Sequence, residues 1–156
     1  MDLLNEFTEL IGELEANDIP YATCGGLAMA VHGLIRATKD IDIMISEGDL
    51  ERAFDVVRGR GYDIEGLPLN FNDQGTKIRR ISKIDKEARL LITVDFILAT
   101  AAMSDVWEDR ELANWGGGTA WVVSRRGLRK MKALAGREQD LLDIKYLDSL
   151  DDEDKE

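Results

Sequence analysis

Apolar residues recur every three or four positions in several stretches of the chain, the period of one face of an α-helix. In the first stretch Leu3, Phe7 and Leu10 follow this spacing, and Asn17-Asp18-Ile19-Pro20 ends it with turn residues and a proline. The pattern predicts an amphipathic helix there. The same spacing, bounded by capping residues and glycines, predicts further helices at residues 27–34, 47–58, 104–112, 125–135 and 138–150.

Other stretches are continuous apolar runs or alternate with a period of two, as β-strands do. Residues 77–84 and 89–98 are joined by Asp85-Lys86-Glu87 and predict an antiparallel hairpin. Its second arm is the most hydrophobic run of the chain. Further strands are predicted at 21–24, 36–45 and 119–123, with a short one near 67–71.

Helices that alternate with strands, without an internal repeat or a linker-like segment, predict a single domain. The expected fold class is α/β (α+β), a mixed β-sheet flanked by helices over residues 1–147. Residues 148–156 hold six acids and one lysine, and we expect them to form an acidic, flexible tail.

The last predicted helix, 138–150, contains two acids, Asp140 and Asp143, that we expect to be surface residues or partners of Arg137 rather than ligands. In this helix and in the one before it, apolar positions with helical spacing define the side that should face the core. These inward positions are Leu128, Met131 and Leu134 in one helix, and Leu141, Ile144 and Leu147 in the other.

The formal net charge of the 156-residue chain is −11 at pH 7. An acidic body argues against an extensive nucleic-acid-binding surface, because neutralising several phosphates needs clustered basic residues. Two basic segments, at 77–89 and 125–137, are either solvated faces or places for small anionic ligands. No run of 18 apolar residues and no basic N-terminal leader occurs, so we expect a cytoplasmic protein with no membrane segment.

Candidate chemistry begins with two carboxylates in the second predicted strand. Asp40 and Asp42 share one face of that strand, while Ile41, Ile43 and Ile45 share the other and are assigned to the core. The Cα atoms of the two aspartates are expected to lie about 6.5–7 Å apart, so both side chains can reach one cation. Paired carboxylate oxygens suit Mg²⁺ or Mn²⁺ rather than Zn²⁺.

A third carboxylate, Asp95, interrupts the hydrophobic run 90–98. An ionised carboxylate in a central strand costs several kcal/mol unless it is paired or coordinated. Two explanations stay open: a third metal ligand beside Asp40 and Asp42, or a structural salt bridge to an arginine.

Gly25 and Gly26 stand at a predicted strand-to-helix junction, where backbone N–H groups can approach a phosphate. Carboxylates on a neighbouring strand can hold the divalent ions that bridge such phosphates. The combination predicts two-metal chemistry on a nucleotide, in which one ion activates an attacking hydroxyl and the other neutralises the leaving pyrophosphate.

The chain combines these motifs in order: Gly25-Gly26, His32-Gly33, Arg36-x-Thr38-x-Asp40-Ile41-Asp42, Val94-Asp95-Phe96, and Lys132 with Gly136-Arg137. The joined pattern resembles the nucleotidyltransferase superfamily with the DNA polymerase β-like fold. In particular it is similar to the small bacterial group of AbiEii-type and minimal nucleotidyltransferases, and it covers residues 21–147.

The resemblance implies that Asp40, Asp42 and Asp95 are catalytic and hold the metal, with Asp95 assisting deprotonation of the acceptor. It further implies that Gly25 and Gly26 form the loop that binds the nucleotide phosphates. The family's basic groups near the triphosphate correspond to Lys132 and Arg137, and Arg36 either pairs with a carboxylate or reaches a phosphate.

The implied activity is that of a metal-dependent nucleotidyltransferase, which moves an NMP from an NTP to a hydroxyl or phosphate of an unidentified acceptor. Mg²⁺ or Mn²⁺ is the implied cofactor, as two ions when NTP is bound. One alternative is a catalytically weak, nucleotide-binding component of a toxin–antitoxin pair, whose acidic surface binds an antitoxin-like protein partner. A further alternative is an antibiotic-type nucleotidyltransferase, whose acidic surface attracts a cationic small molecule.

Overall fold

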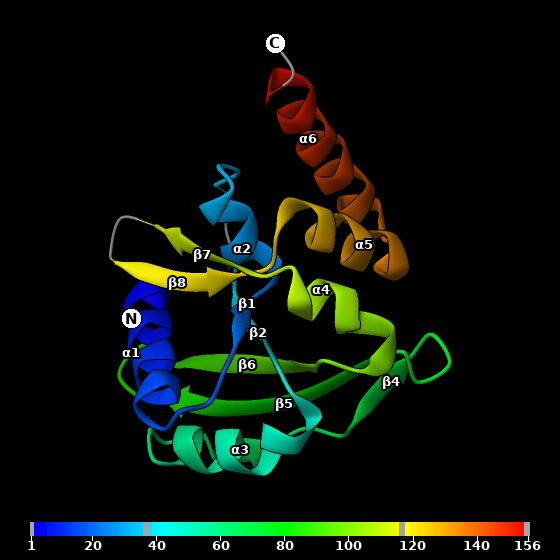
Figure 1. Ribbon diagram of the computed structural model, residues 1–156. Coiled ribbons are helices and arrows are strands. Elements are labelled where there is room, and N and C mark those ends of the chain that lie inside the picture. The colour runs from blue at the N-terminus through cyan, green and yellow to red at the C-terminus, as the bar shows by residue number, and fades with distance from the viewer. Residues whose placement is uncertain (1, 36–37, 116–117, 155–156) are drawn as a thin grey trace.

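A computed structural model describes residues 2–35, 38–115 and 118–154 of the chain (Figure 1). Its helices occupy most of the segments with helical periodicity. Ser124 begins one of them by accepting a hydrogen bond from the Gly127 N–H, and Gly136 ends it in the left-handed conformation. The helices are α1 (Leu3–Ala16), α2 (Gly25–Val31), α3 (Leu50–Arg58), α4 (Ser104–Glu108), α5 (Arg125–Ala135) and α6 (Glu138–Asp154), with 3₁₀ turns at Glu47–Asp49 and Ala101–Met103.

The strands form one mixed sheet in the described part of the chain, with the order β3-β5-β6-β2-β1-β8-β7 and β4 paired to β5. β2 runs parallel to β6 and β1 parallel to β8, while the other neighbouring pairs are antiparallel. The predicted single domain with a mixed sheet is confirmed. The strands are β1 (Ala22–Thr23), β2 (Asp40–Ile45), β3 (Ile64–Glu65), β4 (Leu69–Phe71), β5 (Thr76–Asp85), β6 (Leu90–Leu98), β7 (Glu111–Asn114) and β8 (Thr119–Val122).

Helices cover both faces of the sheet (Figure 1). On one face α1 and α3 pack on the inward isoleucines of β2 and on Val94 and Phe96 of β6. On the other face α2, α4, α5 and α6 pack around Met44 and Ile97. Because side chains alternate along a strand, the aspartates of β2 and β6 lie on this second face, on the side of α2 and α5.

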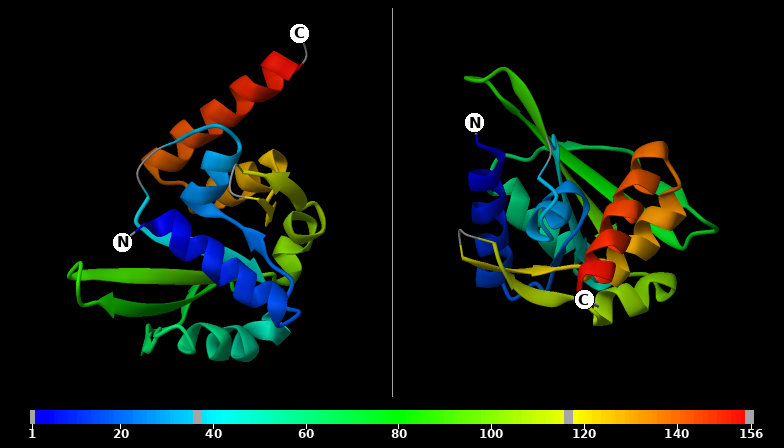
Figure 2. Two further views of the ribbon diagram at one scale, coloured as in Figure 1. Left: turned by 90° about the vertical axis from the view of Figure 1, so that its left-hand side faces the viewer. Right: turned by 90° about the horizontal axis from the view of Figure 1, so that it is seen from above.

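The β5–β6 hairpin extends past the strands on either side of it (Figure 2). β2 pairs with β6 only from Thr93 onward, and β3 pairs with β5 at Ile81 and Ser82. The ribbon near its turn therefore has two open edges. This end of the hairpin carries three exposed apolar side chains, Ile84, Leu90 and Leu91.

Several predicted boundaries are wrong. The helix expected over 104–112 ends at Glu108, and Leu112 lies on β7, because Glu111–Asn114 pairs with β8 to complete the sheet edge. Strand β2 begins at Asp40 rather than at residue 36; residues 36 and 37 lie outside the described part of the chain. The last helix, expected to end near Leu150, continues to Asp154.

The inward faces of the last two helices are also partly wrong. Leu134 and Leu141 are exposed, whereas Lys132, Asp140 and Asp143 are buried. An ion-pair cluster of these three charged residues thus replaces part of the expected apolar contact between α5 and α6. Among the described helices, none is both long and apolar enough to span a membrane.

Candidate active site

Asp42 and Asp95 lie directly opposite each other on the parallel strands β2 and β6. Asp40 lies two residues earlier on the same face of β2, opposite Thr93. Neighbouring strands are about 4.8 Å apart, so the Asp42 and Asp95 side chains leave the sheet side by side. Sequence alternation predicted that Asp40 and Asp42 share a face; the strand pairing adds Asp95 to it.

The environment of Asp42 disfavours its ionised form. Burial, followed by the negative charges of Asp95 and Asp40, raises the pKa of Asp42 to about 7. The positive charges of Lys132 and Arg80 act in the opposite direction without cancelling this effect. A cation placed against Asp42 would relieve the repulsion between these carboxylates.

Asp95 is held in a bidentate ion pair by Arg80 of β5. Arg80 Nε donates to Asp95 Oδ1 over 2.8 Å, and Nη2 donates to Oδ2 over 2.9 Å. The Asp95 side chain is only 9% exposed, whereas that of Arg80 is 45% exposed. Of the two explanations offered by the sequence, the salt bridge to an arginine is therefore present in this structure. It does not preclude metal binding, since a carboxylate oxygen has more than one lone pair.

The donor set fits a hard divalent cation, although its ligands are not fully assembled. Asp40, Asp42 and Asp95 offer carboxylate oxygens on one face, the ligand type that Mg²⁺ and Mn²⁺ prefer. In the stretches 2–35, 38–115 and 118–154, no three His, Cys, Asp or Glu side chains form a ready-made metal site. Both Asp95 oxygens instead accept hydrogen bonds from the Arg80 guanidinium.

Gly25 and Gly26 allow the start of α2 to approach this face of the sheet closely. A Cβ atom on Gly25 would lie 2.0 Å from Asp42 Oδ2, and the φ of Gly25 is +61°. A Cβ atom on Gly26 would lie 2.8 Å from the Thr38 hydroxyl oxygen. Both glycines are therefore required by packing against Asp42 and Thr38, and they place the backbone of α2 beside the carboxylates.

Lys132 and Arg137 approach the site from α5 and the turn after it. Lys132 is buried and lies 3.3 Å from Asp140 Oδ1 and 2.9 Å from Asp143 Oδ2. Arg137 is 75% exposed, and its Nε donates to Asp140 Oδ2 over 2.8 Å. Hydrogen bonding to Asp140 raises the pKa of Arg137, and the charge of Asp42 contributes. The predicted Arg137–Asp140 pairing is confirmed, but Asp140 and Asp143 are buried rather than on the surface.

Arg36, the remaining predicted nucleotide-binding residue, lies outside the described residues. Arg80 and Thr38 were not predicted from the sequence as site residues. Arg80 was visible as part of a basic segment, and its even spacing from Ser82 along β5 is a signal for its face once the hairpin pairing is known. Thr38 belongs to the motif Arg36-x-Thr38-x-Asp40 that carries the resemblance, but no role was inferred for its hydroxyl.

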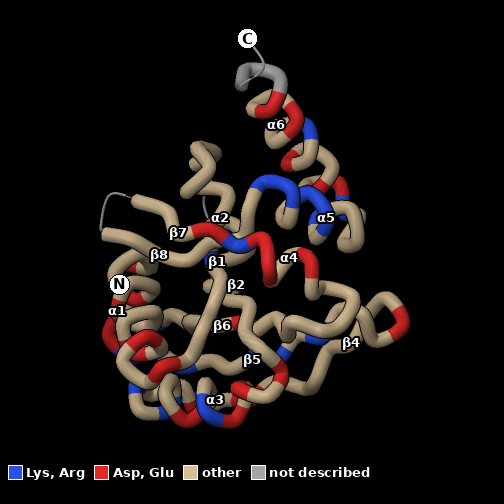
Figure 3. The backbone as a smooth tube through the Cα atoms, viewed as in Figure 1, with Lys and Arg blue, Asp and Glu red and all other residues tan. Residues whose placement is uncertain are grey.

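The second basic segment, at the start of α5, lies next to acidic residues of α4 and α6 (Figure 3). Ion pairs join its arginines and lysines to these acids, so much of its positive charge is compensated within the molecule. The pairs are Arg125 with Asp151, Arg126 with Asp109, Arg129 with Asp148 and Asp151, and Lys130 with Asp105.

The opposite face of the sheet holds another buried carboxylate, Glu6 of α1. It accepts hydrogen bonds of 2.8 Å from both Tyr62 Oη and Lys83 Nζ, and Arg60 lies 3.6 Å away. Burial alone would raise the pKa of Glu6, but the hydrogen bonds from Lys83 and Tyr62 lower it below its ordinary value.

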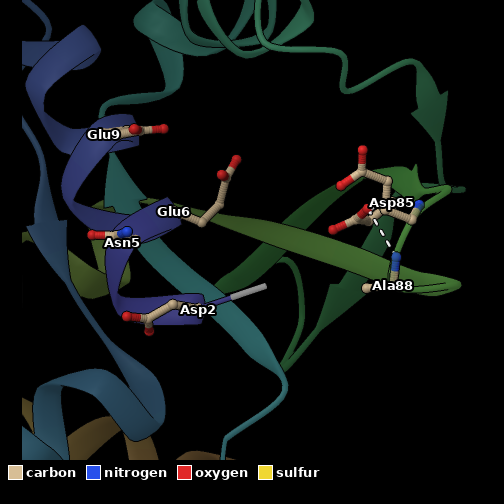
Figure 4. Close-up of a pocket in the computed structure, with 7 residues that line it drawn as sticks. Asp2, Asn5, Glu6, Glu9, Asp85 and Ala88 are labelled. Atoms are coloured by element: carbon tan, nitrogen blue, oxygen red, sulfur yellow. Dashed lines mark hydrogen bonds between the residues drawn. The ribbon is translucent and has the colours of Figure 1, made fainter.

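A hollow of about 520 Å³ lies beside Glu6, between α1 and the turn of the β5–β6 hairpin. In Figure 4, Glu6 and Glu9 extend from α1 on one side of it and Asp85 lies on the other. None of the three candidate catalytic aspartates lines this hollow. Its lining residues are Asp2, Asn5, Glu6, Glu9, Asp85, Glu87 and Ala88.

No protein-family model matches the chain, and no curated protein matches it by sequence. Solved structures do share its fold. TM1012 from Thermotoga maritima, a candidate nucleotidyltransferase, has a TM-score of 0.61 and 13% identity, with 94% of this chain and 92% of that one covered.

Two antibiotic-modifying enzymes are similar in structure as well. For the lincosamide antibiotic adenylyltransferase LnuA, solved with lincomycin bound, the TM-score is 0.61 at 15% identity, covering 93% of this chain and 96% of LnuA. For ANT(2″)-Ia in complex with adenylyl-2″-tobramycin, the TM-score is 0.59 at 13% identity, covering 84% and 75%. The nucleotidyltransferase-like fold predicted from the sequence is thereby confirmed.

Proposed function

We propose that this chain is a nucleotidyltransferase that requires Mg²⁺ or Mn²⁺ and moves an NMP from an NTP to an acceptor hydroxyl or phosphate. The observation that supports it best is the pairing of Asp42 with Asp95 on adjacent strands, with Asp40 on the same face. Packing gives no reason to place carboxylates side by side, whereas metal-dependent transfer within a nucleotidyltransferase-like fold does.

Asp40, Asp42 and Asp95 would hold the metal ions. When bound, these ions would lower the pKa of the attacking hydroxyl and neutralise the phosphates and the leaving pyrophosphate. Asp95 has the second task of accepting the proton of the acceptor hydroxyl as its oxygen bonds to the α-phosphorus and the bond to pyrophosphate breaks. Asp95 is suited to this task because it lies beside Asp42 but on a separate strand.

The nucleotide phosphates would lie along the start of α2. Gly25 and Gly26 have no side chains there, and Thr38 offers a hydroxyl next to Gly26. Arg137, with its exposed guanidinium, would contact the triphosphate directly, and we assign the same role to Arg36. Lys132 is buried between two carboxylates, so it would act on the phosphates through its charge.

A small molecule is the acceptor class that we favour, within an AbiEii-type or minimal nucleotidyltransferase acting in the cytoplasm. LnuA, solved with lincomycin bound, is matched over 96% of its length, so this fold accommodates an antibiotic without a large added domain. ANT(2″)-Ia, whose complex contains adenylyl-2″-tobramycin, supports the same class.

The test is an incubation of the purified protein with each labelled NTP and Mg²⁺, in the presence of lincomycin, tobramycin or a cell extract. We expect a labelled product with one of these acceptors and none with Asp42→Asn. An absence of product under all conditions, or an undiminished product with Asp42→Asn, would contradict the proposal.

One observation favours a second candidate, a protein that binds nucleotide without transferring it, as in a toxin–antitoxin component. Both oxygens of Asp95 are engaged by Arg80, as expected of a structural carboxylate. This candidate predicts NTP binding without any labelled product, and tight binding of a partner protein.

A further inference from the structure

Arg80, Asp95 and Asp42 form a row across three neighbouring strands. Arg80 lies opposite Asp95 in the antiparallel pairing of β5 with β6, and Asp95 lies opposite Asp42 in the parallel pairing of β6 with β2. All three side chains leave the same face of the sheet. The row places one guanidinium at the edge of the carboxylates that would hold a divalent cation.

Asp95 needs a positive partner even when no divalent cation is bound. It is 7% exposed on a strand whose neighbours Val94 and Phe96 are fully buried, and an isolated buried carboxylate costs several kcal/mol. Arg80 supplies the partner through two hydrogen bonds, and each Asp95 oxygen accepts one of them.

Arg80 is placed so that it can leave Asp95 without unfolding the site. Nearly half of its side chain is exposed, so the guanidinium can return to water at little cost. Lys132, a second cation near Asp42, is instead buried and fixed by Asp140 and Asp143. Of the two, only Arg80 can exchange its place with an incoming cation.

We propose that Arg80 is a positioning residue that competes with the divalent cation for Asp95. Without the cation its guanidinium neutralises and orients the carboxylate; cation binding takes at least one Asp95 oxygen from it. The inference rests on the cation requirement of the proposed function, but its test needs neither nucleotide nor acceptor. A failed transfer assay and a failed test of Arg80 are therefore separate results.

The test measures the Kd of Mn²⁺ for the full chain by electron paramagnetic resonance, without nucleotide, in the wild type and in Arg80→Met. Removing one positive charge beside the ion should lower this Kd by about tenfold. Arg80→Lys keeps the charge and should give a Kd within about threefold of the wild type.

Arg79→Met is the matched control. Arg79 is the next residue of β5, points to the opposite face, and donates to Asn70 Oδ1 over 3.0 Å. Its replacement removes the same charge from the same strand and should leave the Kd unchanged. If Arg80→Met fails to fold, Arg80→Gln, which retains a hydrogen-bond donor, takes its place in the measurement.

A second arm repeats Arg80→Met in the Asp95→Asn background, where the tenfold gain should largely disappear because there is no charged carboxylate to compete for. The proposal would be overturned by an unchanged Kd in Arg80→Met, by an equal change in Arg79→Met, or by an undiminished gain in the Asp95→Asn background. Absence of Mn²⁺ binding in both the wild type and Arg80→Met would overturn it as well.

Discussion

Two carboxylates, the buried Glu6 and the half-buried Asp42, lie on opposite faces of the same sheet and have different surroundings. Glu6 receives hydrogen bonds from Lys83 and Tyr62, and its pKa is lowered despite its burial. The loss of solvent around Asp42 and the negative charges of Asp95 and Asp40 raise its pKa to about 7. Burial acts to raise the pKa of both carboxylates, so it does not explain why the two pKa values shift in opposite directions.

The difference lies in the partners. Around Glu6 the fold provides donors and cations, as expected for a carboxylate that helps to hold α1 on the sheet. Around Asp42 it provides further acids, an arrangement that costs stability unless a ligand uses it. Matched partners thus indicate a structural role for Glu6, and like-charged neighbours make Asp42 the better functional candidate.

The largest expected effect is on transfer. Asp95→Asn keeps the size of the side chain and removes the charge that accepts the proton, so the rate should fall by about 10²- to 10⁴-fold. NTP affinity should stay within about tenfold of the wild type, because Asp40 and Asp42 remain. Glu6→Gln, a neutralised buried acid on the other face, is the control and should retain full transfer. Equal losses in both variants would remove the distinction between the two faces.

The next effect is on stability. Glu6→Gln leaves Lys83 without its buried partner and should cost about 3 kcal/mol of unfolding free energy, measured by urea denaturation. Asp42→Asn relieves repulsion and should leave the free energy unchanged or increase it. A larger loss in Asp42→Asn than in Glu6→Gln would show that the roles are reversed.

The smallest effect is on the pH dependence of stability. The pKa of Asp42 is raised above its unfolded value, so between about pH 4 and pH 7 the folded chain keeps a proton that the unfolded chain has released. The contribution of Asp42 to the free energy of unfolding therefore falls as pH rises through this window. Asp42→Asn should reduce the fall in unfolding free energy from about pH 5 to pH 8 by about 1 to 2 kcal/mol.

Glu6 provides the opposite sign. Its lowered pKa stabilises the fold above its unfolded pKa, and this contribution is lost only as pH falls below about 4.5. Glu6→Gln should therefore keep the wild-type slope between about pH 5 and pH 8. An unchanged slope in Asp42→Asn, measured from melting curves across the range, would refute the Asp42 assignment.

Local periodicity was enough to predict the strands that carry the site, the shared face of Asp40 and Asp42, and the hairpin. It could not predict that β2 and β6 are neighbours, because that pairing joins segments about fifty residues apart. The opposition of Asp42 and Asp95 depends on this pairing, so periodicity could not predict it; only the family resemblance implied that the two residues act together.

The partners of the site depend on details that periodicity does not resolve. Arg80 lies opposite Asp95 because Asp85 pairs with Leu90 at the end of the hairpin. The turn between these two residues is shifted by one or two positions from the predicted turn, Asp85-Lys86-Glu87. Lys132 is four residues after Leu128 and shares its buried side, but a lysine is rarely assigned to a core. Its burial became possible only because Asp140 and Asp143 turn toward it from α6.

The projecting end of the β5–β6 ribbon has a consequence for solubility. Open strand edges with exposed apolar side chains, here Ile84 and Leu91, are templates for pairing with another chain. The neighbouring acids Asp85 and Glu87, with the net charge of −11, oppose such aggregation at neutral pH. Near the isoelectric point of about 4.6 this repulsion vanishes, so acidified solutions should precipitate through this edge first.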